Sequence, residues 1–205
     1  VERGSADKLF INTAGIGLVP PDVHISATAA KPGDVVLLSG AIGDHGIAIM
    51  TQREGLRFAS PIQSDCAPLN GLVEAMLAAC RDIHVLRDPT RGGLATTINE
   101  LAEQSNVGVE IEESRVPIHE PVRAASEILG LDPLYVANEG KLIAMVAEYD
   151  AERVLQAMRQ HPYGREAAII GRVVDLHPGR VVLHTVLGTH RLLDMLTGEQ
   201  LPRIC

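Results

Sequence analysis

The side chain best placed to carry a chemical group is the last one, Cys205. It follows Leu201, Pro202, Arg203 and Ile204, so its thiol lies beside the terminal carboxylate. That negative charge disfavours the thiolate, which is the reactive form of cysteine. A chain end can nevertheless bring a thiol into a pocket of its own or another chain. We therefore interpret Cys205 as a thiol that a partner enzyme loads; the alternative is that the chain simply ends there.

A second chemical group lies in segment 135–141, YVANEGK, which leads into the apolar stretch 142–146. A carboxylate at the mouth of a buried strand is placed to act as a general base, so Glu139 is a candidate for that role. The alternative is a surface ion pair between Glu139 and Lys141, with Gly140 as a turn residue. On spacing alone, the ion pair is the favoured interpretation.

A glycine-rich turn occupies segment 39–46, SGAIGDHG, between an expected strand and an expected helix. Glycines permit positive φ and can aim backbone amides at an anion near a helix start. The spacing is not that of a dinucleotide fingerprint, and Asp44 would repel a phosphate unless Mg²⁺ lay between them. A tight strand-to-helix turn explains the segment equally well.

A similar junction follows at segment 87–94, RDPTRGGL. Asp88 or Thr90 can cap the following helix, and Gly92 and Gly93 allow another backbone or a ligand to approach closely. With Arg91, the segment holds more charged and flexible residues than capping requires. We expect it to face a ligand at the helix N-terminus, which attracts anions.

The composition narrows the class of protein. The chain has a formal net charge of -8, 46% hydrophobic residues and no Trp. The acidic balance and the scarcity of aromatic side chains argue against nucleic acid or an anionic membrane as the main partner. No apolar run is long enough to cross a bilayer, no histidine spacing matches a zinc site, and three cysteines make no disulfide framework. These features predict a cytoplasmic protein in which Cys80 is buried and Cys66 can be exposed.

The elements that must position these segments alternate between strands and helices, which predicts a mixed α/β layer structure rather than a purely parallel sheet. Expected strands lie at 35–39, 84–86, 107–111 and 142–146, and expected helices at 46–54, 69–80, 92–103, 121–129 and onward from a cap at Asp150. Segments 168–174 and 181–185 are predicted to form a hairpin around the turn 177–180, with a third strand from Arg191.

The start of the chain suggests a piece of a longer protein, because it opens on Val1 and reaches an apolar stretch within a few residues. A turn cluster near residue 30 favours a domain boundary there. We expect residues 1–30 to end one domain, residues 31–196 to form a C-terminal α/β domain, and residues 197–205 to be a flexible tail.

Four segments together resemble one family, the HypE carbamoyl dehydratases of nickel-iron hydrogenase maturation. They are IGDHGIAIM at 42–50, DPTRGGLAT at 88–96, LYVANEGKL at 134–142 and PRIC at 202–205. The resemblance covers essentially the whole chain. It places the chain in the superfamily of aminoimidazole ribonucleotide synthetase, and implies that most of an N-terminal, dimer-forming ATP domain, with its Mg²⁺ ligands, lies upstream of Val1.

The resemblance also implies a reaction and roles. HypF, a carbamoyltransferase, would load Cys205 with a carbamoyl group, and ATP would activate the resulting carboxamide for dehydration to a thiocyanate. Glu139 would be the general base, and the cyano group would pass to iron on a HypC-HypD complex. Asp88, Arg91, Gly92 and Gly93 would face the nucleotide, with Asp44 a further candidate, and no residue is assigned as a metal ligand.

Two other functions stay open at this point. One is a different ATP-dependent member of the superfamily that acts on a free small molecule, in which Cys205 is incidental. The other is a docking module for partner maturation proteins, without ATP turnover.

Overall fold

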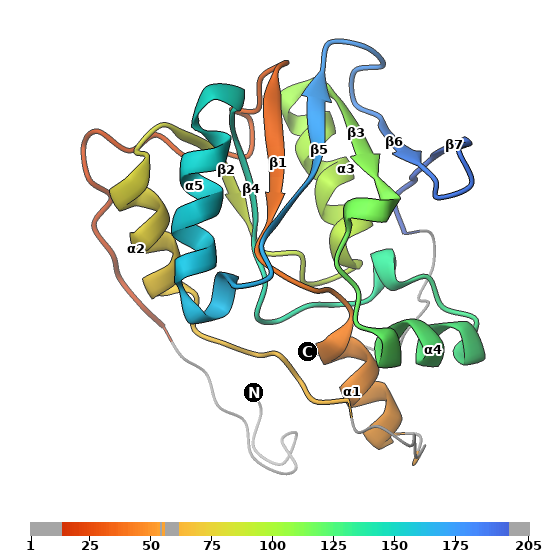
Figure 1. Cartoon of the computed structure of the whole chain (residues 1–205). Coiled ribbons are helices and arrows are strands. Elements are labelled where there is room, and N and C mark those ends of the chain that lie inside the picture. Colours follow the sequence, from red (N-terminus) through yellow and green to blue (C-terminus); the bar gives the residue numbers. More distant parts are fainter. Residues whose placement is uncertain (1–13, 54, 56–61, 197–205) are drawn as a thin grey trace, which may run out of the picture.

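The computed structural model describes residues 14–53, 55 and 62–196. Cys205, the rest of segment 197–205 and residues 1–13 of the expected first-domain remnant lie outside the described residues. Within the described range the structure is a single sheet with helices on both faces (Figure 1). The predicted mixed α/β class is therefore confirmed.

Seven strands form the sheet in the order β2-β4-β1-β5-β3-β6-β7, with antiparallel pairing except between β3 and β6. The central strands are apolar runs with most side chains buried, as a sheet covered on two faces requires. The strands are β1 (Asp34–Leu38), β2 (Ile83–Arg87), β3 (Gly108–Glu112), β4 (Ile143–Ala147), β5 (Ala168–Val174), β6 (Val181–His184) and β7 (His190–Leu192).

The helices divide the core into layers. Helix α3 (Gly93–Ser105) covers one face of the sheet, and α2 (Asn70–Ala79) and α5 (Glu148–Gln160) pack side by side on the other (Figure 1). Along β1 the side chains alternate, so that Val36 and Leu38 face the α3 layer and Leu37 faces the α2 and α5 layer. Strand periodicity thus assigns successive residues to opposite cores.

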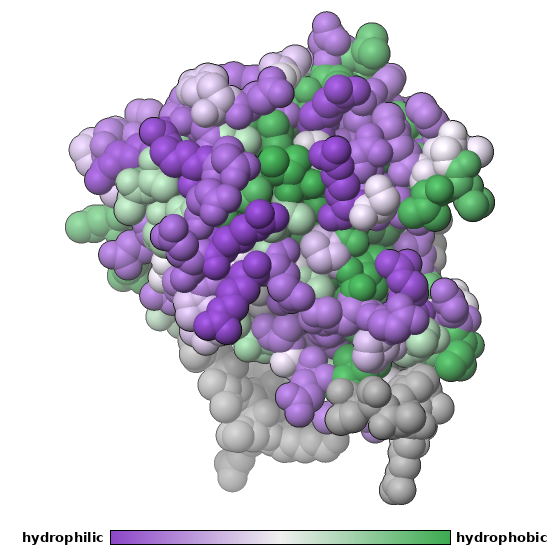
Figure 2. Space-filling view, in the orientation of Figure 1, coloured by the Kyte–Doolittle hydropathy of each residue, from purple (hydrophilic) through white to green (hydrophobic). Residues whose placement is uncertain are grey.

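A third, smaller core joins α1 (Asp44–Arg53) to α4 (Glu120–Leu129) beyond the end of β1 (Figure 1). Short 3-10 helices occur at Glu113–Arg115, Pro133–Tyr135 and Pro162–Gly164. Most of the visible face is hydrophilic, with apolar residues gathered over the middle of the sheet and beside β6 and β7, where Val186 and Leu187 are exposed (Figure 2). Among the described residues, no helix is both long enough and apolar enough to cross a membrane.

The predicted hairpin of β5 and β6 is wrong. Strand β3 lies between them and pairs antiparallel with β5 and parallel with β6. Gly108 makes this insertion possible, because a Cβ there would lie 1.9 Å from the carbonyl oxygen of Leu176 in the β5–β6 connection. The turn itself is fixed to the β3 side by a hydrogen bond from Gly179 N to Val107 O, 2.8 Å.

The predicted cap at Asp150 is also wrong. Helix α5 begins at Glu148 with Ala147 in the N-cap position, so Asp150 lies inside the first turn. Its buried carboxylate pairs with Arg153 and accepts a hydrogen bond from the Cys80 thiol, 3.3 Å. Burial raises the pKa of Cys80, which confirms it as a buried thiol that stays protonated, whereas Cys66 is exposed as expected.

Candidate functional site

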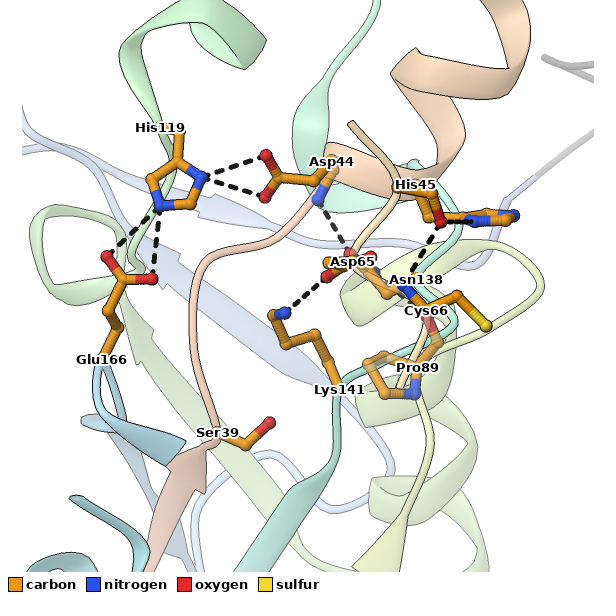
Figure 3. Close-up of polar contacts among 12 residues, drawn as sticks. Ser39, Asp44, His45, Asp65, Cys66, Pro89, His119, Asn138, Lys141 and Glu166 are labelled. Atoms are coloured by element: carbon orange, nitrogen blue, oxygen red, sulfur yellow. Dashed lines mark hydrogen bonds and ion pairs between the residues drawn. The ribbon is translucent and has the colours of Figure 1, made fainter. Parts of the chain in front are cut away.

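The three chemically interesting segments meet at one side chain, Asn138 (Figure 3). Asn138 is fully buried. Its Oδ1 accepts a hydrogen bond from Gly43 N at 2.8 Å, and its Nδ2 donates to Pro89 O at 3.1 Å and to Val136 O at 2.9 Å. Because each of these backbone groups belongs to a different segment, the Asn138 amide joins all three immediately before Glu139.

The glycines at these junctions mainly allow backbone segments to pack together. A Cβ on Gly46 would lie 2.4 Å from Val136 Cγ1, and one on Gly93 would lie 2.6 Å from Leu134 O. Gly93 also has φ +64, and Gly92, with φ +70, is the N-cap of α3. The prediction that Asp88 or Thr90 caps this helix is therefore wrong. Gly92, in the left-handed conformation, occupies the N-cap position, and no side chain caps the helix.

The charged residues of the α3 junction lie at the surface. The side chain of Asp88 is 61% exposed and lies 3.8 Å from Arg87, which also pairs with Glu100 at 3.1 Å. Arg91 is exposed and makes no hydrogen bond or ion pair with any residue in the described ranges. Asp88 and Arg91 are thus available to a ligand, whereas Gly92 and Gly93 shape the helix start.

The predicted surface pair between Glu139 and Lys141 does not form. The Lys141 ammonium lies 2.5 Å from Asp65 Oδ2, and both side chains are nearly nine-tenths buried. Gly140 permits this approach, because a Cβ there would lie 1.8 Å from Asp65 O. Glu139 is partly exposed and has no hydrogen bond or ion pair to another described residue. No described residue therefore competes for its carboxylate, which could accept a proton from a group brought within hydrogen-bond reach.

A histidine bridges two carboxylates beside this loop (Figure 3). His119 Nδ1 lies 3.0 Å from Asp44 Oδ1, and its Nε2 lies 3.2 Å from both oxygens of Glu166. The hydrogen bond to Asp44 raises the pKa of His119, and Glu166 raises it further. Burial raises the pKa of Asp44, while His119 opposes that shift. The bridge holds the start of α1 against the segment before β5.

A pocket of about 440 Å³ opens between these groups. Its floor includes Ser39, whose hydroxyl accepts a hydrogen bond from Leu142 N at 3.0 Å. The lining residues are small or polar: Ser39, Gly40, Ser64, Asp65, Cys66, Ala67, Gly140, Lys141, Pro162, Tyr163, Arg165 and Glu166. Glu139 directly precedes two of them. Among the described residues, no group of three or more potential metal ligands is assembled.

The sequence pointed to Glu139 and Asp44 as candidates but not to Asn138, His119, Asp65 and Glu166, which lie beside them in the structure. Their partners lie many positions away in the chain: 75 residues separate His119 from Asp44, and 95 separate Asn138 from Gly43. No local pattern marks such pairs. Cys205, the other predicted catalytic residue, lies outside the described residues.

Comparison with known proteins gives a family for most of the chain. Residues 31–184 match the model of the AIR synthase related protein, C-terminal domain. The chain is 60% identical over 205 residues to a carbamoyl dehydratase HypE from Azotobacter vinelandii, covering all of this chain and 60% of that protein. The chain thus spans about three-fifths of the length of this relative.

Two solved structures are also similar. A hydrogenase maturation protein HypE in complex with ATP matches with a TM-score of 0.84 and 53% identity, over 88% of this chain and 55% of that one. A HypE-HypF complex matches with a TM-score of 0.80 and 48% identity, over 84% of this chain and 56% of that one.

Proposed function

The chain belongs to the AIR synthase related family, whose C-terminal domain it carries, and on this premise we propose that it is part of a carbamoyl dehydratase of hydrogenase maturation. The observation that carries the proposal is the 60% identity to a carbamoyl dehydratase over all 205 residues. That match spans the segments that hold Glu139 and Cys205. Residues 1–30 would end the ATP-binding domain, residues 31–196 would form the C-terminal domain, and residues 197–205 would be the reactive tail.

The proposed reaction converts an S-carboxamide on Cys205 into an S-thiocyanate. The carboxamide carbon must lose its oxygen and the nitrogen must lose two protons, so that a carbon-nitrogen triple bond forms. Oxide cannot depart at neutral pH; ATP, when bound, supplies a phosphoryl group with which that oxygen leaves as phosphate. The residues of this chain then have to position the tail and remove the nitrogen protons.

Glu139 is the proposed acceptor of a nitrogen proton. The absence of any hydrogen bond or ion pair to other described residues leaves its carboxylate free to take a proton, and the buried Asn138 beside it holds the loop in place. A general base within reach of the reacting group typically contributes a factor of about 10² to 10⁴. Glu139 is therefore expected to act after the carbamoyl group has been loaded.

We assign nucleotide contacts to the exposed end of the α3 junction. Arg91 lacks a partner among the described residues and Asp88 is mostly exposed, so both can reach a nucleotide held mainly by an upstream domain. Gly92 and Gly93 would contribute through the shape of the helix start. Asp44, held by His119, could approach a phosphate only with Mg²⁺ between them, and we place the Mg²⁺ ligands chiefly upstream of Val1.

The proposed partners follow from the reaction. HypF would load Cys205, as the similar HypE-HypF complex supports. The HypC-HypD complex would accept the cyano group, and the full protein would be a homodimer through its ATP domain. Neither nucleic acid nor membrane is a proposed partner, in keeping with the net charge of -8.

Mass spectrometry of the C-terminal peptide tests the proposal. The full-length protein is incubated with HypF, carbamoyl phosphate and ATP, and Cys205 should gain first a carboxamide and then a thiocyanate, which is one water lighter. An unmodified Cys205 would contradict the dehydratase and favour an enzyme acting on a free small molecule. Capture of HypF or HypC-HypD without ATP turnover would favour the docking module.

A further inference from the structure

The pocket beside Glu139 contains one buried and one exposed cation. The aliphatic stem of Lys141 passes over Gly40, where an added Cβ would lie 3.3 Å from Lys141 Cε. The missing side chain at Gly40 leaves room for this stem, which a Cβ there would crowd by a few tenths of an ångström. Gly140 makes room in the same way for the backbone of Asp65. Gly40 and Gly140 thus make room for Lys141, whose side chain is only 12% exposed. Burying its charge costs free energy unless the charge is paired.

The ion pair with Asp65 neutralises Lys141. Lys141 Nζ lies 2.5 Å from Asp65 Oδ2, and the other oxygen, Oδ1, has no hydrogen-bond partner among the described residues. An ammonium carries three donors and the Asp65 carboxylate occupies one side of it. Lys141 can therefore bind an incoming anion without leaving Asp65.

The second cation at the pocket is the exposed Arg165. No hydrogen bond or ion pair joins its guanidinium to another residue in the described part of the chain. The neighbouring Glu166 is already engaged, because both of its carboxylate oxygens lie 3.2 Å from His119 Nε2. Pairing Glu166 with Arg165 would weaken that contact. A guanidinium presents a planar fork of donors that matches phosphate oxygens.

We propose that this pocket binds a phosphoryl group, with Lys141 and Arg165 as its cationic ligands. A singly charged carboxylate would be matched by Arg165 alone, whereas a phosphoryl group carries the charge and the oxygens to engage both cations. The volume of about 440 Å³ admits a phosphate together with an attached group. Only the identification of the natural source, the phosphate that leaves the carboxamide next to Glu139, rests on the proposed function.

Binding of inorganic phosphate to the full-length protein, measured by calorimetry, tests this site. Lys141→Gln should weaken binding at least about tenfold, because it removes a charge-assisted contact. Arg165→Gln should weaken binding less, about threefold to fivefold, because its guanidinium is exposed and screened. Asp65→Asn should instead strengthen binding about threefold, because a repelling carboxylate is lost. Lys31→Gln and Asp82→Asn, at the opposite end of the sheet, are the matched controls and should change nothing.

The opposite signs at Lys141 and Asp65 separate a ligand site from a structural ion pair. If both substitutions weaken binding equally, or Lys141→Gln leaves it unchanged, the proposal fails. Lys141→Arg keeps the charge and should restore binding to within about threefold, even if Lys141→Gln unfolds the protein. Phosphate binding that survives a saturating non-hydrolysable ATP analogue indicates the leaving phosphate, whereas competition indicates a nucleotide phosphate. Loss of dehydratase activity with phosphate binding intact would refute the proposed function alone.

Discussion

A histidine pairs with an aspartate near each end of strand β1, and the two pairs differ in how completely they are enclosed. At the start of β1, His84 Nδ1 lies 2.8 Å from Asp34 Oδ2, and both side chains are more than nine-tenths buried. At the other end, His119 meets Asp44 at 3.0 Å, but the imidazole is 46% exposed and continues to Glu166.

The surroundings sharpen this difference. Asp34 Oδ2 also accepts a hydrogen bond from Lys31 N at 2.9 Å, and Lys31 Nζ lies 3.2 Å from His84 Nε2, so the polar atoms there satisfy one another. Beside the His119 pair lie the Lys141–Asp65 ion pair, which faces the pocket, and Arg165, which has no hydrogen bond or ion pair to another described residue. The buried His84–Asp34 pair therefore stabilises the fold. The His119–Asp44 pair lies in a region where charged side chains face the pocket and can contact a ligand.

The largest expected effect is that of Glu139→Gln in the full-length protein, because Glu139 lies beside the pocket in the less enclosed region. Carbamoylation of Cys205 should proceed normally, while cyanation should fall about 10² to 10⁴-fold because the proton acceptor is gone. The two species are followed by mass spectrometry of the C-terminal peptide. Cyanation at the normal rate would remove Glu139 as the base.

Asn138→Ala should cause the largest loss of stability. It leaves Gly43 N and Val136 O without their side-chain partner, and each buried orphan costs about 1 to 3 kcal/mol, whereas Pro89 O keeps the backbone hydrogen bond from the N–H of residue 138 at 3.2 Å. We expect the free energy of unfolding to fall by about 4 kcal/mol in urea titrations. Asn70→Ala, at an exposed position, is the control. A loss as small as in that control would contradict the role of Asn138 in joining the three segments.

His84→Ala tests the enclosed pair. Removing the histidine leaves the Asp34 carboxylate buried with one partner fewer, at a cost of about 3 kcal/mol in the free energy of unfolding. His24→Ala, on the exposed segment before β1, should cost little. Protein that remains folded should still cyanate Cys205, because this pair lies at the end of β1 away from the pocket. A loss of cyanation without a loss of stability would show that the His84–Asp34 pair serves the reaction rather than the fold.

The smallest effect is expected at His119, through pH. The raised pKa of His119 means that its contribution is fully present below its ordinary value of 6.5 and is lost as pH rises through the folded value. The raised pKa of Asp44 acts in the same direction at lower pH, since ionising Asp44 becomes costly above its ordinary 3.8. Exposure and screening limit the His119 contribution to less than about 1 kcal/mol. His119→Gln should flatten the decline in stability above pH 6.5, and an unchanged slope would show that His119 is not its source.

Much of this arrangement could be predicted because it depends on local pattern. The apolar run 142–146 and the alternation in β1 marked buried strands. The segments around Asp44, Pro89 and Glu139, which the sequence singled out, lie together because they converge on Asn138. What failed depended on distant partners. Lys141 was paired in prediction with Glu139, two residues away, whereas Asp65 lies 76 positions earlier in the chain and approaches it through Gly140.

The hairpin prediction failed for the same reason. A turn with Gly179 between two apolar runs is a strong local signal, but it does not reveal a strand from 60 residues earlier that enters between them. The match to the AIR synthase related family model, over residues 31–184, includes all three of these strands, β3, β5 and β6.

The insertion of β3 between β5 and β6 has a consequence for how the molecule is made. During synthesis β3 leaves the ribosome long before either neighbour, and its edges stay open until the last strands arrive, an arrangement of high contact order that slows folding. The segment that ends in Cys205 follows β7 directly in sequence. A chain interrupted before β6 would therefore lack the cysteine and expose β3 as an unpaired edge, a feature that chaperones and proteases act on. The fold thus couples possession of the thiol that we propose to be reactive to completion of the sheet.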